Sequence, residues 1–293
     1  MGCSGSLLRL ARQRAAVSAE TSRRSTQPAW SRYNPRMATP APPTRQEPAD
    51  WQHYELWIRV RDAIRALPDY FKTSTNIEGI LGPDIFTLNS VLGATIEEQI
   101  VRTLNDLRPV WDPDKQYQTY AFVRQPQCFP DVVLRQKTNG QNILMGIELK
   151  GWYLLASEAE PSLRFYATPA VCNPWDLLVV VPWALSNVLA GSPIAYAPFI
   201  ETARFCAQRR NYYWEYERKA KGDTGVILST HTTPYPKKSD PISDRAVADA
   251  GGNFGRIARY GVMDAYVDEM MQTDLAGIPA AAWLEFFRKF ARE

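Results

Sequence analysis

The chain has 293 residues, 45% apolar and 22% charged, which is enough for one sizeable globular domain or two small ones. Its formal net charge of +3 permits a nucleic-acid partner without requiring one. Only two histidines are present, which excludes zinc sites of the His-Glu-x-x-His type, and the four cysteines lack metal-binding or disulfide spacing. No segment approaches the about 20 apolar residues of a membrane helix, so we expect a cytoplasmic protein with reduced thiols and no membrane partner.

Residues 1–49 differ in composition from the rest of the chain. Arg, Ser, Pro and Ala predominate, and Glu20 is the only acid before Glu47, so we expect a disordered extension. The segment has features of an organelle transit peptide, and its first six residues match a myristoylation pattern. We favour a third interpretation, a non-native or misassigned start, with Met37 as a candidate for the true initiation residue.

Two helices are predicted in the first part of the domain, which we expect to span residues 50–293. Apolar residues recur at helical spacing from Trp51 to Leu67, where Pro68 ends the pattern. A second apolar stripe, at positions 92, 96, 100, 104 and 107, predicts a helix over residues 90–107 that stops before Arg108-Pro109.

Residues 129–150 predict a β-hairpin. Two runs of alternating apolar residues flank Asn139-Gly140, which is the strongest short-range signal for a two-residue type I′ turn. This turn would fix the register and make one face of the ribbon largely apolar. The expected pairs on that face are Val132 with Ile147, Leu134 with Met145, and Gln136 with Ile143.

The other face of the hairpin carries charged side chains. Asp131 is expected opposite Glu148, with Lys150 two residues further along the same face, and directly opposed Cβ atoms lie about 4.5–5.5 Å apart. Because two close carboxylates repel, a cation should lie between them, and a carboxylate-bound Mg²⁺ ion is the simplest candidate. Gly146, in mid-strand, suggests close approach of another backbone or a phosphate. The alternative is an ordinary surface hairpin with a charged solvent face.

The rest of the chain predicts further elements of an α/β domain. Residues 151–173 would form a crossover loop beside the charged face, and the apolar run over 176–183 predicts a central strand covered on both faces. A helix over 198–221 and a strand over 225–229 follow, then a helical C-terminal part whose apolar stripe would pack on the core or on a second subunit. The sum is a mixed β-sheet of four or five strands with helices on both faces.

A basic region could contact nucleic acid. Residues 204–238 hold eight Lys or Arg against three acids, interleaved with aromatic residues. A solvated helix face with inward aromatics is the alternative. Loops 229–238 and 251–259 offer donors, acceptors and glycines near these charges. The candidate DNA contacts are Arg204, Arg209, Arg210, Lys219, Lys237, Lys238, Asn253 and Arg256.

Pro130-Asp131, followed by Glu148-Leu149-Lys150, resembles the motif of the PD-(D/E)XK nuclease superfamily, whose two elements lie on adjacent antiparallel strands. Pro-Asp also occurs at 68, 83 and 113, and Glu217-Arg218-Lys219 is a second match to the triplet. Only the pair at 131 and 148 is joined by a turn that places both acids on one face, whereas Glu217 follows a segment typical of a helix.

The resemblance implies a restriction-endonuclease-like fold and a type II restriction enzyme that cuts double-stranded DNA as a homodimer. Asp131 and Glu148, with the carbonyl of Leu149, would hold Mg²⁺, and Lys150 would stabilise transition-state charge or position the attacking water. Many such nucleases add a Glu from the first helix, and Glu97 fits that pattern better than Glu98. The alternatives are a repair, recombination or RNA-processing nuclease of this superfamily and a non-catalytic DNA-binding protein on the same scaffold.

Overall fold

The computed structural model describes residues 39–125, 127–158, 161–219 and 222–290. Its compact unit runs from Pro40 to Glu293 and begins earlier than the expected boundary at residue 50. Residues 39–49 contain no helix or strand, yet Arg45 in this segment forms an ion pair of 2.6 Å with Glu201. The expected disorder of residues 1–38, and Met37 as a start, lie outside the described residues.

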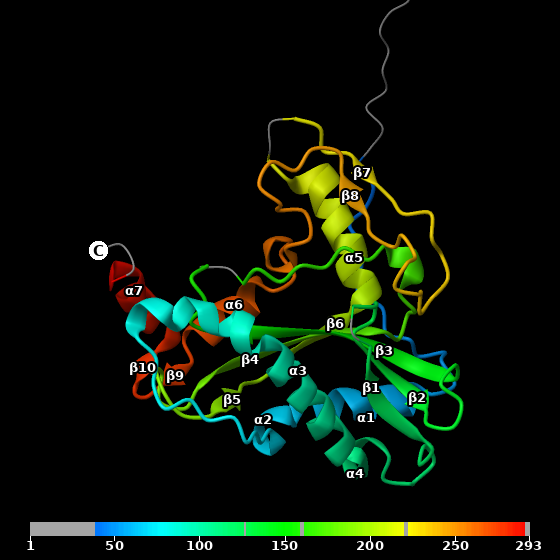
Figure 1. The fold of residues 1–293 in the computed structure, drawn as a ribbon. Helices are drawn as coiled ribbons and strands as arrows, with labels where there is room; N and C mark the ends of the chain where they lie inside the picture. The colour runs from blue at the N-terminus through cyan, green and yellow to red at the C-terminus, as the bar shows by residue number, and fades with distance from the viewer. Residues whose placement is uncertain (1–38, 126, 159–160, 220–221, 291–293) are drawn as a thin grey trace, which may run out of the picture. The chain divides into compact units, whose positions relative to one another are not determined.

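One mixed sheet organises the compact unit (Figure 1). β1 (Tyr120–Arg124), β2 (Val132–Gln136), β3 (Ile143–Tyr153) and β4 (Leu177–Leu185) are neighbours in that order. The first two pairings are antiparallel, and the pairing of β3 with β4 is parallel. The predicted α/β class with a mixed sheet is therefore confirmed.

The last edge of the sheet consists of two short strands. β5 (Pro193–Ala195) pairs with the C-terminal part of β4, and β6 (Phe199–Thr202) pairs with its N-terminal part, both antiparallel. They act as successive pieces of one broken edge strand, so the sheet is five positions wide. All nine residues of β4 are buried, as the uninterrupted apolar run predicts for a central strand.

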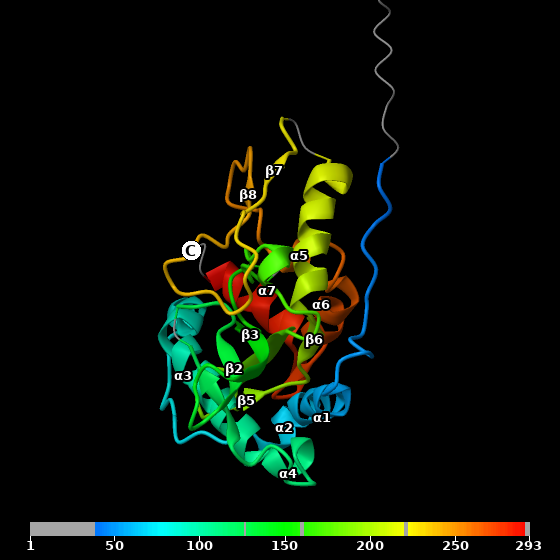
Figure 2. The same ribbon diagram turned by 90° about the vertical axis from the view of Figure 1, so that its right-hand side faces the viewer.

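Helices cover both faces of the sheet. α3 (Leu88–Asp106) packs on β1 and β3, and α5 (Ala203–Tyr212) packs on β4 and β6. Figures 1 and 2 show these two helices on opposite sides of the sheet. The apolar stripe predicted for residues 90–107 is the buried face of α3. The remaining helical elements before the sheet are α1 (Tyr54–Arg65), α2 (Leu67–Tyr70), the 3₁₀ segment η1 (Gly82–Thr87) and α4 (Arg108–Trp111).

The predicted helix over residues 198–221 is wrong at its start. Its first residues form β6, because pairing with the exposed edge of β4 satisfies their backbone groups. α5 follows, and the chain then widens into a π-helical turn, η3 (Tyr213–Glu217). The end of the predicted helix, at Lys221, lies outside the described residues.

The C-terminal part contains short strands and two helices. Phe287 of α7 (Ala280–Phe290) is buried, whereas Phe286 and Phe290 are about half exposed, so only part of the expected stripe packs on the core. No helix of the described residues is long and apolar enough to cross a bilayer. The other elements are η2 (Pro169–Val171), β7 (Val226–Ile227), β8 (Arg245–Ala246), η4 (Ile257–Arg259), α6 (Asp264–Met271), β9 (Asp274–Leu275) and β10 (Ile278–Pro279).

A fully buried ion pair joins α5 to the segment before β8. Arg210 donates to Asp244 at 2.6 Å, and both side chains are 0% exposed. The guanidinium also donates to the carbonyls of Phe165 and Ala167. Such a pair is costly to break, because the remaining charge is left buried and uncompensated.

We predict that Asp244→Ala lowers the free energy of unfolding by about 3–5 kcal/mol, since Arg210 would remain charged and buried. Urea denaturation measures the effect. Glu285→Ala, which removes an exposed ion pair with Lys289, is the matched control and should barely shift the midpoint. Equal shifts in the two variants would contradict the structural role of the buried pair.

Candidate active site

The hairpin of β2 and β3 has the predicted register where it passes the charged residues. Val132 pairs with Ile147, Val133 with Gly146, and Leu134 with Met145. This part of the ribbon is held on its other side by β4, which pairs with β3 from Ile147 onward. The alternation of apolar residues therefore predicted the pairing correctly near the site.

The predicted two-residue turn is wrong. Gly140 lacks the positive φ that a type I′ turn requires, and the turn instead runs over Asn139–Asn142, closed by a hydrogen bond from Asn142 N to the carbonyl of Asn139. The side chain of Asn139 accepts from Gln141 N and stabilises this conformation. Gln136 consequently bonds to Asn142 rather than facing Ile143.

A β-bulge absorbs the difference between the predicted and observed turns. Leu134 pairs with Met145 but Arg135 pairs with Ile143, so Leu144 is the extra residue on β3. The bulge lies between the turn and the charged residues. The register at the site is thus independent of the turn type.

Gly146 is required by close contact, as its mid-strand position suggested, but the neighbour differs from the prediction. A Cβ atom at this position would lie 2.3 Å from Cγ of Pro130 and 3.2 Å from Oδ1 of Asp176. The closest group is thus the proline ring that precedes Asp131, rather than another backbone.

Asp131, Glu148 and Lys150 meet on one side of the hairpin. Lys150 Nζ lies 2.6 Å from Oε1 of Glu148 and 3.2 Å from Oδ2 of Asp131, and the same Asp131 oxygen accepts from the backbone N–H of Leu149 at 3.0 Å. Both carboxylates therefore contact one ammonium nitrogen and lie close together. Glu148 is only 8% exposed, so its carboxylate does not lie on an open solvent face.

The electrostatics of this cluster reflect burial and crowding of charge. Burial raises the pKa of Glu148 to about 7, against the attraction of Lys150 and with added repulsion from Asp131. Burial alone would lower the pKa of Lys150, but the charges of Glu148 and Asp131 outweigh it and raise that pKa, so the side chain is an ammonium. Lys150 is thus a cation between the two acids, where a metal ion was expected.

The oxygen groups around Lys150 are those that a small hard cation prefers. The N–H and C=O of one strand residue point to the same side, so the Leu149 carbonyl faces the side on which its N–H meets Asp131. Two carboxylates and this carbonyl fit Mg²⁺ chemically. Within the described residues, no group of three or more His, Cys, Asp or Glu side chains is placed to hold a metal.

Glu97, rather than Glu98, lies near the cluster. Burial and then the charge of Asp131 raise the pKa of Glu97, and Arg124 of β1 holds its carboxylate at 2.8 Å. Glu98 is exposed and pairs with Arg102 of the same helix. Of the two acids considered from the sequence, Glu97 is thus the one that lies close to Asp131.

One of the candidate DNA contacts is wrong. Arg210 is fully buried in its pair with Asp244 and cannot reach a phosphate. Sequence composition suggested an exposed basic helix, but a distant acid neutralises this arginine inside the fold.

The other candidates fall into two groups. Lys219, Lys237 and Lys238 are exposed, and Lys238 donates to Gln127, which places its loop beside the segment that leads to Asp131. The remaining candidates have partners within the chain: Arg204 donates to the carbonyl of Cys172, Arg209 pairs with Glu217, Arg256 pairs with Glu158, and Asn253 accepts from Arg259.

Asp176 supports the site, although its sequence position did not single it out. Its buried carboxylate accepts from the N–H groups of Gly146 and Asn173, both at 2.7 Å, and from the hydroxyl of Tyr235. Burial raises the pKa of Asp176 to about 6. An Asp directly before an uninterrupted apolar strand was the only available signal.

Comparisons of the chain with protein-family models, with curated proteins and with solved structures found no match.

We predict that Gly146→Ala destabilises the protein by about 1–3 kcal/mol, because the added methyl group would overlap the Pro130 ring. Urea denaturation measures the change. Gly79→Ala is the matched control, since its Cβ would meet no atom within 4 Å. If both variants unfold at the same urea concentration, the contact between Gly146 and Pro130 is not a packing constraint.

Proposed function

We propose that this protein is a Mg²⁺-dependent DNA endonuclease of the PD-(D/E)XK type, with Asp131, Glu148 and Lys150 as its catalytic residues. The proposal is supported chiefly by the convergence of two carboxylates and an ammonium, from Asp131 directly before β2 and from Glu148 and Lys150 on the antiparallel neighbour β3, with Glu148 buried. A strongly raised carboxylate pKa with a specific charge partner is typical of functional sites.

Asp131, Glu148 and the carbonyl of Leu149 are the residues that would hold the metal. A bound Mg²⁺ ion lowers the pKa of a coordinated water and neutralises charge on the scissile phosphate. Lys150, kept charged by its two acid neighbours, would donate to a non-bridging phosphate oxygen or orient the attacking water. Glu97 would hold its carboxylate toward the site through its bond to Arg124.

We propose that the protein is a cytoplasmic type II restriction enzyme. Its substrate would be double-stranded DNA, cut at a specific sequence. Lys237 and Lys238 would contact phosphates, because their loop lies beside the segment leading to Asp131. Cutting both strands needs two sites, so we propose a homodimer. Discrete fragments from phage DNA would support restriction, whereas a smear would favour another nuclease of the superfamily.

We predict that Asp131→Ala abolishes cleavage of phage DNA in Mg²⁺, because the substitution removes a metal ligand. DNA affinity, measured by gel shift in Ca²⁺, should be retained, because Asp131 is not a phosphate contact. Lys150→Ala should reduce the cleavage rate by on the order of 10²–10³, through loss of charge stabilisation.

Glu217→Ala is the control for these two variants, because Glu217 belongs to the rival triplet and pairs with Arg209 in a π-helical turn. It should cleave within a few-fold of the wild-type rate. Loss of cleavage in Glu217→Ala, with cleavage retained in Asp131→Ala, would refute the assignment of the site.

The two neighbouring acids of α3 provide a second test. Glu97→Gln should lower cleavage by about 10–100-fold, as expected for a residue that supports a metal site, whereas Glu98→Gln should leave it unchanged. Single-turnover cleavage rates at saturating Mg²⁺ measure both effects. Equal rates for the two variants would remove Glu97 from the proposed site.

A further inference from the structure

A separate pocket lies at the turn end of the hairpin. It has a volume of about 1120 Å³, and its lining comes from the segment before α1, the loop before β1, the start of β3 and the loop before β4. Proline, leucine and isoleucine line part of it, together with five aromatic rings. None of the described residues that line it belongs to the catalytic cluster.

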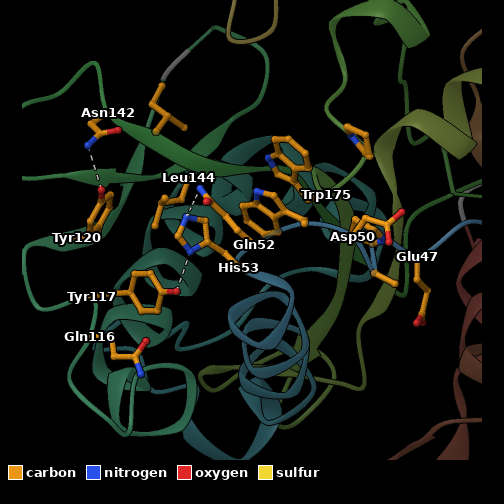
Figure 3. Close-up of a pocket in the computed structure, with 15 residues that line it drawn as sticks. Glu47, Asp50, Gln52, His53, Gln116, Tyr117, Tyr120, Asn142, Leu144 and Trp175 are labelled. Atoms are coloured by element: carbon orange, nitrogen blue, oxygen red, sulfur yellow. Dashed lines mark hydrogen bonds between the residues drawn. The ribbon is translucent and has the colours of Figure 1, made fainter.

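The ring side chains form a half-buried platform. Trp51 and Trp175 stack with centroids 4.7 Å apart and an interplanar angle of 3°, and His53 meets Trp51 edge to face. His53 is hydrogen-bonded to the hydroxyl of Tyr117 at 2.9 Å. Figure 3 shows His53 between Trp175 and Tyr117, with Tyr120 further along the same side. Such a surface offers flat apolar area to a planar ligand.

Amide side chains surround these rings. Gln52, Gln116 and Asn142 are all exposed, and Gln116 forms no side-chain hydrogen bond with any other described residue. Asn and Gln present a donor and an acceptor side by side, which matches the edge of a nucleobase, adenine above all.

The charge of the pocket limits the ligand further. Its described lining contains Glu47 and Asp50 but no Lys or Arg, so it is unsuited to a free phosphate. Burial lowers the pKa of His53 and so disfavours a positive charge on its ring. A cage for a quaternary ammonium needs ring faces on several sides, whereas Trp51 and Trp175 are parallel and cover each other.

We infer that this pocket binds a nucleobase, stacked on the Trp51–Trp175 platform and hydrogen-bonded at its edge by the surrounding amides. Base–aromatic stacking tolerates any base, and the amides would add preference for a purine. The base could come from a free nucleoside or from an unpaired position in a DNA strand. The inference is independent of the proposed cleavage, because no residue of the catalytic cluster takes part.

Calorimetric titration with adenosine tests this, using the full chain in EDTA so that cleavage is absent. Adenosine should bind, and Trp51→Ala should weaken binding by about 5- to 100-fold through loss of one stacking ring. Trp51→Phe, which keeps a ring, should recover most of the affinity. Tyr70→Ala removes an exposed ring outside the pocket and should bind adenosine like the wild type.

Competition then identifies the source of the base. Displacement of adenosine by a single-stranded oligonucleotide would assign the pocket to an unpaired DNA base, and binding of adenosine without such displacement would assign it to a free nucleoside. Absence of adenosine binding, equal affinity in Trp51→Ala and wild type, or tighter binding of choline than of adenosine would overturn the inference.

Discussion

The antiparallel pairing of β2 with β3 is the constraint on which the candidate site depends. Once Val132 pairs with Ile147, Asp131 and Glu148 must lie near one another, and Lys150 contacts both. The surrounding structure holds this pairing in place. The Pro130 ring packs where Gly146 has no side chain, and β4 fixes β3 from the other side. A site held in this way does not depend on mobile loops for its geometry.

The β-bulge at Leu144 divides the hairpin into two parts with different roles. Leu144 itself and, toward the turn, Asn142 and Ile143 line the aromatic pocket, while the acids lie at the other end of the regular ladder. A bulge ends strict pairing and re-aims side chains without moving the ladder behind it. Changes in the turn can therefore alter the pocket while Glu148 and Asp131 keep their relation. The two sites share one ribbon but do not share a local geometry.

The sequence predicted those features that depend on local periodicity. Alternation predicted β2, β3 and their register from Val132 to Leu134, helical spacing predicted α3, and an unbroken apolar run predicted β4. The features that the sequence did not predict depend on contacts between residues far apart in the chain. Residues 199–202 become a strand because the edge of β4 is available, and Arg210 is buried because Asp244, far along the chain, neutralises it. The aromatic pocket is built from four separate segments, so no local pattern could reveal it.

The net charge of the Asp131, Glu148 and Lys150 cluster distinguishes it from the buried ion pair of Arg210 and Asp244. A structural pair balances one acid with one base, as Arg210 and Asp244 do without contact with solvent. Asp131, Glu148 and Lys150 instead leave one negative charge in excess, and burial, with added repulsion from Asp131, raises the pKa of Glu148 to about 7. The excess is relieved either by a proton on Glu148 or by a further cation beside the two acids. Burial of unbalanced charge is costly, so a cluster that needs a proton or a further cation does not stabilise the fold. The cluster does have the negative charge and the oxygen groups that a divalent metal requires.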